Sequence, residues 1–187
     1  LMNGDHRDLH SFPTRRSSDL VQDHPGKGAD HILSLVQTGL IEVDYAVVLL
    51  HVGSNDMHLT TKHGHLKSTL PDPEATASKI LQIGQEIKRR NPKAHIIISA
   101  VFDRPDNWDG SQPFITKLNS KLRQLRRPFF MIDTDRILRK KMKKLGETIY
   151  HDDWLHLNQL GKNILAEEFG KTFRYHLEHV LACQGHP

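Results

Sequence analysis

The chain has 187 residues, 37 % of them hydrophobic and 26 % charged, with a formal net charge of +4. This composition and length are typical of a soluble protein with a single globular domain. The longest apolar run, residues 46–50, is far shorter than the roughly 20 residues that span a bilayer. The single cysteine, Cys183, excludes an internal disulfide framework. We expect no membrane span and no cofactor, and the sequence indicates neither a compartment nor an oligomeric state.

Residues 1–20 differ in pattern from the rest of the chain. The stretch from Gly4 to Leu20 resembles a one-frame translation of a short sequencing adapter. It has no helical or strand period and only scattered apolar residues, so we expect a non-native, disordered segment. The globular domain is then expected to span residues 21–182, and residues 183–187 to form a carboxyl-terminal tail.

The first expected elements lead to an unbroken apolar strand. Residues 21–24 are typical of the end of a strand, and residues 25–28 of a turn. A helix is expected from Ala29, ending near Gly39. Its buried face would consist of Ile32, Leu33, Val36 and Leu40. Residues 45–52 then predict a strand buried on both faces, as in a parallel sheet.

Helices and strands continue to alternate down the chain. Helices are expected over residues 73–90, 113–126 and 136–144, and strands over residues 94–101 and 128–133. Asn158 can cap a long last helix. That helix is expected to bury Leu160, Ile164, Phe169, Phe173, Leu177 and Leu181. The alternation predicts a three-layer α/β/α sandwich around a parallel sheet.

Two polar motifs flank these elements. Gly53-Ser54-Asn55-Asp56 directly follows the central strand, at the sheet edge where ligands of open parallel sheets bind. About a hundred residues later, Asp153-Trp154-Leu155-His156 places a carboxylate and an imidazole three residues apart, before the last helix. Taken separately, the first motif can be an Asx-capped turn and the second a helix cap.

In order along the chain, these two motifs resemble the SGNH (GDSL-type) hydrolase family. Gly26 also lies where that family keeps an oxyanion glycine, and the resemblance covers most of residues 21–181. It implies a flavodoxin-like parallel sheet, here expected to lack its first strand and helix. It also implies hydrolysis of a small-molecule ester by a Ser-His-Asp triad with an Asn/Gly oxyanion hole.

The resemblance assigns a role to each matching residue. His156 would be the general base and Asp153 its orienting acid, with Asp152 as the rival. The Asn55 side-chain amide and the Gly26 N–H would stabilise the oxyanion. Gly53 and Asp56 would support the turn that aims Asn55.

The family motif with the nucleophilic serine is not recognisable. A crossover between parallel strands takes roughly 30 residues or more, whereas 25 residues precede Gly26. Ser11, Ser17 and Ser18 are the hydroxyls in that stretch, and Ser18 matches the family signature superficially. We therefore expect the nucleophile to be absent and the chain to be inactive. A non-catalytic interaction module of the same fold and a flavodoxin-like ligand-binding domain are the alternatives, although no Gly-rich phosphate loop supports the latter.

Three further features carry weaker signals. Basic residues concentrate in residues 117–127 and 136–144 without interleaved aromatic residues, which favours solvated helix faces over nucleic-acid binding. His63-Gly64-His65 has a spacing that metals use, but a surface loop without metal is favoured because no acidic or Cys partner is near. Arg104 is a candidate contact for an anionic substrate group, with a local ion pair as the alternative.

Overall fold

The computed structural model describes residues 22–57, 72–102, 111–125, 128–146, 148–153 and 156–183. Helices and strands alternate in the order α1 (Ala29–Thr38), β1 (Val47–Leu50), α2 (Pro73–Arg90), β2 (His95–Ser99), α3 (Ser111–Leu122), β3 (Phe129–Ile132), α4 (Thr134–Leu145) and α5 (Gln159–Cys183). Their order is the predicted one. The proposed roles of His63, His65 and Arg104, and the expectation for residues 1–20, lie outside the described residues.

The three strands form one parallel sheet in the order β1-β2-β3. Val47 of β1 pairs with His95 of β2, and Ile96 of β2 pairs with Phe129 of β3. Because all three strands run in the same direction, their carboxyl ends meet at one edge of the sheet. The α/β fold with a parallel sheet is confirmed.

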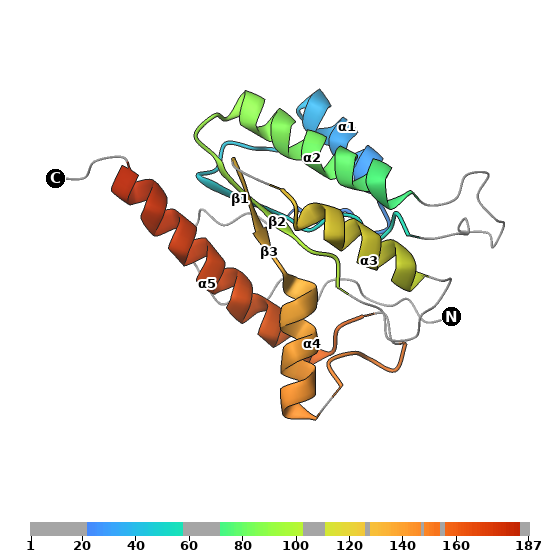
Figure 1. Cartoon of the computed structure of the whole chain (residues 1–187). Helices are drawn as coiled ribbons and strands as arrows, with labels where there is room; N and C mark the ends of the chain where they lie inside the picture. The colour runs from blue at the N-terminus through green and yellow to red at the C-terminus, as the bar shows by residue number, and fades with distance from the viewer. Residues whose placement is uncertain are drawn as a thin grey trace, which may run out of the picture.

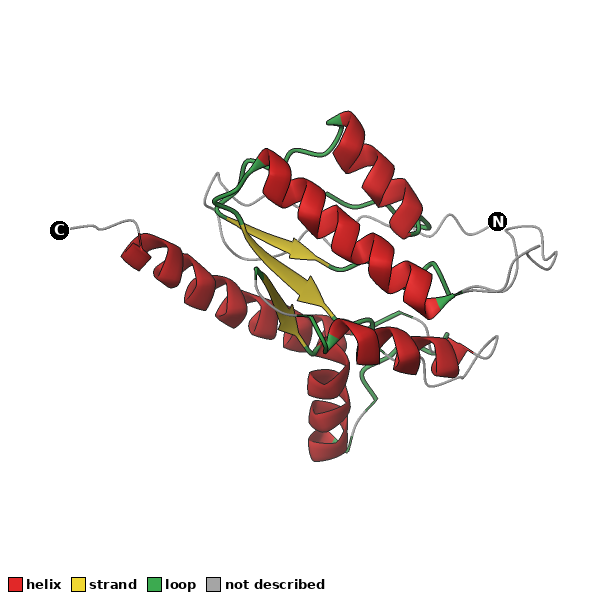
Figure 2. Cartoon of the chain, turned by 45° about the horizontal axis from the view of Figure 1, so that its top comes forward, coloured by secondary structure: helices red, strands yellow, loops and turns green. Residues whose placement is uncertain are grey.

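Helices cover both faces of this sheet (Figure 1). Helices α1, α2 and α3 lie on one face, and α5 crosses the other (Figures 1 and 2). Successive strand residues point to opposite faces, so Ile96 and Ile98 enter the core shared with α1–α3. On the α5 face, the rings of Phe130 and His176 lie 4.3 Å apart between centroids. Side chains thus pack between the sheet and helices on each of its faces, which gives the three layers that the alternating pattern predicts.

Several predicted helix ends are confirmed. Helix α2 has the predicted bounds, residues 73–90, and Asp72 just before it accepts a hydrogen bond from the Glu74 N–H at 2.8 Å. Gly39 follows the end of α1, as predicted. Asn158 Oδ1 accepts the N–H of Gly161 at 3.0 Å, which is the predicted cap of α5.

Two predictions near the amino-terminal end of the domain are wrong. Residues 22–24 are not a strand, because they have no ladder partner among the described residues and a strand needs one. Leu40 is 73 % exposed instead of buried. The chain turns at Gly39 with φ 78°, which carries Leu40 away from the face that Ile32 and Val36 bury.

The buried face of the carboxyl-terminal half of α5 was also predicted wrongly. Phe173 and Leu177 are 36 % and 44 % exposed, whereas His176 and Val180 are buried. Successive helical residues are rotated by about 100°, so packing His176 against Phe130 turns Leu177 out of the core.

None of the helices in the described part of the chain combines the length and apolar character that a membrane span requires.

Candidate active site

Asp153 and His156 are hydrogen bonded to each other. The Asp153 Oδ2 atom lies 2.6 Å from His156 Nδ1, and Asp153 Oδ1 accepts the backbone N–H of His156 at 2.9 Å. One carboxylate therefore fixes both the imidazole and the backbone that carries it. The His156 side chain is 61 % exposed. With Nδ1 held by the acid, Nε2 is the ring nitrogen left to accept a proton from a hydroxyl group.

The segment around this pair is fastened to a small core. Tyr150 and Leu157 form an isolated antiparallel bridge, and the Asn158 N–H donates to the Ile149 carbonyl at 2.9 Å. The buried side chains beneath it come from this segment, α4 and α5: Leu138, Ile149, Tyr150, Leu157 and Ile164. The acid–imidazole pair is thus carried by a braced hairpin-like segment.

The turn after β1 is tied to the first residue of α1 and to the residues just before it. Both carboxylate oxygens of Asp56 accept the N–H of Ala29, at 3.1 and 3.0 Å. The Asn55 side-chain amide donates to the Lys27 carbonyl at 3.1 Å. A carboxylate at a helix amino terminus satisfies an otherwise unpaired N–H and interacts favourably with the helix dipole. These contacts bring Gly26 and Asn55, which are far apart in the sequence, into one unit.

Two N–H groups in this unit are unengaged within the described residues. The backbone N–H of Gly26 makes no hydrogen bond there, and Asn55 uses one of its two amide hydrogens. Gly53 sets the path of the turn, with φ 117°. A Cβ at position 53 would lie 3.1 Å from the Leu118 side chain and 3.2 Å from that of Val101. The turn that presents Asn55 therefore requires a glycine at this position.

His51 and Phe102 connect this unit to the acid–imidazole segment. The His51 ring, which follows β1, stacks on Phe102 with 5.1 Å between centroids and 13° between planes. Phe102, which follows β2, packs against the cluster that contains Tyr150 and Leu157. Both parts therefore lie at the carboxyl edge of the sheet. No hydrogen bond joins Asn55 to His156 within the described residues.

A buried polar network that the sequence does not predict lies at this edge. The His51 Nδ1 atom lies 3.0 Å from Ser99 Oγ, and Ser99 Oγ lies 2.9 Å from Thr134 Oγ1. Ser99 and Thr134 are fully buried. The network joins the ends of β1 and β2 to the start of α4. Its sequence signal is slight: a polar residue at the end of each of two apolar strands.

Burial lowers the pKa of His51 from its ordinary 6.5 to about 4. The imidazole is then neutral in the fold, while the unfolded chain binds a proton at higher pH. The contribution of the neutral His51 ring to the free energy of unfolding is therefore complete above about pH 6.5, and it is lost as the pH falls towards about 4. We expect the free energy of unfolding to fall by at most about 3 kcal/mol over this range, since each pKa unit corresponds to about 1.4 kcal/mol and the His51 ring keeps some exposure.

Urea unfolding between pH 7 and pH 4.5 checks this expectation. His51→Phe retains a ring against Phe102 but cannot titrate, so its stability should fall less steeply over this window than that of the parent chain. Equal pH profiles for the two proteins would show that His51 does not carry the effect.

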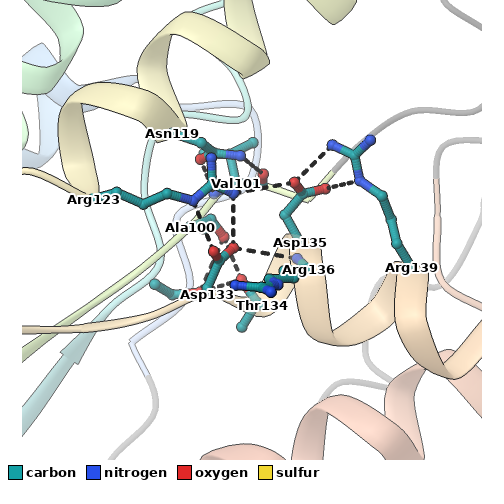
Figure 3. Close-up of polar contacts among 10 residues, drawn as sticks. Ala100, Val101, Asn119, Arg123, Asp133, Thr134, Asp135, Arg136 and Arg139 are labelled. Carbon is teal, nitrogen blue, oxygen red and sulfur yellow. Dashed lines mark hydrogen bonds and ion pairs between the residues drawn. The ribbon is translucent and has the colours of Figure 1, made fainter.

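A second set of polar contacts holds the exit of β2 against α3 and α4 (Figure 3). The Asn119 side chain accepts the N–H of Val101 at 3.0 Å and donates to its carbonyl at 2.6 Å. Arg123 forms two hydrogen bonds with Asp133, at 2.7 and 2.9 Å. These contacts fix the backbone just before Phe102.

No three His, Cys, Asp or Glu side chains in the described part of the chain are arranged to hold a metal ion.

Comparison with known proteins gives likeness in structure but not in sequence. No family model and no curated protein matches the chain. A mutant acetyl esterase with an acetate ion superposes with a TM-score of 0.58 at 17 % identity, covering 84 % of this chain and 71 % of that one. A lipolytic G-D-S-L family protein from Veillonella parvula gives 0.60 at 16 % identity, covering 80 % and 76 %.

Two further solved structures agree. A GDSL-like lipase, described as putative, from Parabacteroides merdae gives a TM-score of 0.61 at 17 % identity, covering 76 % of this chain and 66 % of that one. A carbohydrate esterase of family 3 from Talaromyces cellulolyticus gives 0.56 at 17 % identity, covering 83 % and 70 %. At this identity the likeness concerns the fold alone. The chain has the SGNH (GDSL-type) hydrolase-like fold.

Proposed function

We propose that this chain carries part of the active site of an SGNH-type serine esterase or acyl hydrolase acting on a small-molecule ester. His156 is the general base, Asp153 orients it, and Asn55 and Gly26 donate to the oxyanion. The observation that carries the proposal is the 2.6 Å contact between Asp153 Oδ2 and His156 Nδ1. The fold shared with esterases and lipases supports it.

The proposed reaction has two halves, acylation of the serine and hydrolysis of the acyl-enzyme, and the same groups act in both. His156 Nε2 takes the proton of a serine hydroxyl as its oxygen bonds to the ester carbonyl carbon. The carbonyl oxygen becomes an oxyanion and accepts the Gly26 and Asn55 N–H groups. His156 then protonates the leaving alcohol as the C–O bond breaks. Water attacks the acyl-enzyme by the same steps and releases the acid.

We infer that the nucleophile is not among the serines whose side chains the structure describes. None of those hydroxyl groups is hydrogen bonded to His156, and the buried Ser99 is engaged with His51. Within the described residues, β1 is paired on one side, with β2. We propose that the serine belongs to a strand that pairs with the open side of β1 and is encoded upstream of residue 21 in the natural gene.

Two proteins test this proposal. One is the chain as printed, and the other carries the upstream sequence of the natural gene in place of residues 1–20. We expect no turnover of p-nitrophenyl acetate by the first and measurable turnover by the second. In the second protein, Asn55→Ala should lower kcat by about 10²–10³-fold, the usual effect of removing one oxyanion donor.

The upstream sequence of the natural gene also distinguishes the hydrolase from a non-catalytic module of the same fold. An upstream strand that ends in Gly-Asp-Ser agrees with the hydrolase. A longer chain that folds but hydrolyses no ester, and whose upstream strand has no serine, would instead be a non-catalytic module of the same fold.

A further inference from the structure

Three histidines gather where the carboxyl-terminal half of α5 crosses the sheet. The ring of His95, the first residue of β2, lies 6.0 Å from that of His176 and 5.9 Å from that of His179, both on α5. The Phe130 ring of β3 lies 4.3 Å from His176 and stacks on His95 at 5.7 Å. This histidine cluster, His95, His176 and His179, bridges α5 and the sheet.

The hydrogen bonding of the cluster favours neutral rings. The Nδ1 atoms of His95 and His176 are buried and have no hydrogen-bond partner within the described residues. A neutral imidazole keeps one ring nitrogen without a proton, whereas an imidazolium has an N–H donor at both nitrogens. Protonation would therefore place a charged donor without an acceptor inside the interface, which is more costly than an unpaired neutral group.

The ionisable neighbours of the cluster are positive. Burial, followed by the charge of Lys88 in the last turn of α2 and by His179, lowers the pKa of His95. Burial, followed by His95 and His179, lowers the pKa of His176. The ring of Tyr175 also contacts that of His176, edge-on at 5.2 Å. Within the described residues no carboxylate acts on either ring, so nothing there offsets an added positive charge.

This half of α5 has few other buried contacts with the sheet. Between residues 171 and 180, the buried side chains are His176 and Val180. The first half of the helix is held separately, by the buried Ile164 and by the Asn158 cap. The carboxyl-terminal end of α5 projects past the sheet (Figures 1 and 2). A charge in the cluster thus competes with the few contacts that hold residues 171–183.

We propose that the histidine cluster is an acid-sensitive latch. Protonation of His95 and His176 releases residues 171–183 of α5 from the sheet, while the first half of the helix stays bound. Because the attached rings bind protons less tightly than solvated histidines, the latch is closed above about pH 6.5 and opens as the pH falls below that value. Attraction between an imidazolium and the Phe130 face opposes opening, but it is weaker than the cost of burying an unpaired charge.

Opening of the latch uncovers an apolar part of the sheet. Ile97 is fully buried and points to the same face as His95, because alternate strand residues share a face. Phe130 lies on that face as well. His95 begins β2 and Phe130 is near the start of β3, so the latch lies at the edge of the sheet opposite the candidate active site. Acid therefore exposes this apolar surface without releasing the segment that carries His156.

Hydrogen exchange of the full chain, followed by mass spectrometry, tests the latch. Amides of residues 171–183 are compared with those of α2 at about pH 7.5 and about pH 5.5, after correction for the intrinsic exchange rate at each pH. We expect residues 171–183 to be less protected than α2 and to exchange through a local opening that depends little on low concentrations of urea. Their protection should fall about tenfold or more between the two pH values, since each latch histidine contributes up to about tenfold one unit below its ordinary pKa.

Two substitutions assign the effect to the cluster. His176→Leu keeps an apolar side chain against Phe130 but cannot titrate, so the protection of residues 171–183 should depend less on pH. His51→Phe removes a titrating histidine outside the cluster and should leave the pH dependence of residues 171–183 unchanged. It should reduce the pH dependence of α2, which we expect to exchange through global unfolding. Circular dichroism at about pH 7.5 verifies that each variant folds.

Three results would contradict the latch. Equal protection of residues 171–183 and α2 at both pH values would show that the two segments open together. Protection of residues 171–183 that does not fall between the two pH values would exclude acid release. An equal effect of His51→Phe and His176→Leu on residues 171–183 would place the titrating group outside the cluster. If His176→Leu does not fold, the parent chain and His51→Phe still decide between local and global opening.

Discussion

Replacing His156 by alanine is expected to lower kcat for ester hydrolysis by about 10⁴-fold or more in the chain extended with its natural upstream sequence. The variant has no group to take the serine proton or to protonate the leaving alcohol. Asp153→Asn should cost about 10⁴-fold, because an amide cannot hold the imidazole in the tautomer that the carboxylate selects. Initial rates with p-nitrophenyl acetate measure both effects.

Neighbouring residues provide matched controls for these substitutions. His151→Ala removes an imidazole from the same segment, where the backbone N–H of His151, not its ring, bonds to the His156 carbonyl. Asp152→Asn removes the rival acid, while Asp153 is the residue bonded to His156. Both controls should keep kcat within about threefold. Equal losses in Asp152→Asn and Asp153→Asn would contradict the assigned roles, as would full activity in His156→Ala.

The sequence predicts the helices and strands because local signals define them. The span of α2 is the predicted one, since Pro73 suits a first helical turn and Asn91-Pro92 ends the helix. The strands are shorter than their apolar runs, because strand ends depend on which neighbours supply ladder partners. The buried face of α5 was misjudged for a related reason. Its apolar residues Phe173 and Leu177 compete with His176, and the position of Phe130 on β3 decides the outcome.

The contacts of the candidate site also differ in whether the sequence can predict them. Asp153 and His156 are three residues apart, so a motif is enough to propose their contact. The bond between Asn55 and Lys27 spans 28 residues and depends on the path of α1 and β1. The His51–Ser99–Thr134 network joins three elements and has no recognisable spacing, so it could not be predicted from the sequence.

A substitution in the first turn of α5 tests how closely this helix packs against Ile149. The sign of the change in the free energy of unfolding distinguishes close packing from open space. A Cβ at Gly161 would lie 2.4 Å from the Ile149 carbonyl oxygen and 3.1 Å from Leu157. That carbonyl is backbone and is already bonded to the Asn158 N–H, so it cannot move aside cheaply. We expect Gly161→Ala to lower the free energy of unfolding by about 2–4 kcal/mol, as overpacking does.

Gly170 is the matched control, because it lies in the same helix and a Cβ there would meet its nearest atom, on the flexible Arg174 side chain, at 3.9 Å. Alanine favours a helix interior over glycine by about 1 kcal/mol, so Gly170→Ala should stabilise the protein by up to that amount. Urea unfolding of both variants compares the two. If Gly161→Ala were as stable as Gly170→Ala, the Ile149 carbonyl would not pack against α5. The hairpin-like segment that carries His156 would then lose the support on which the proposed base depends.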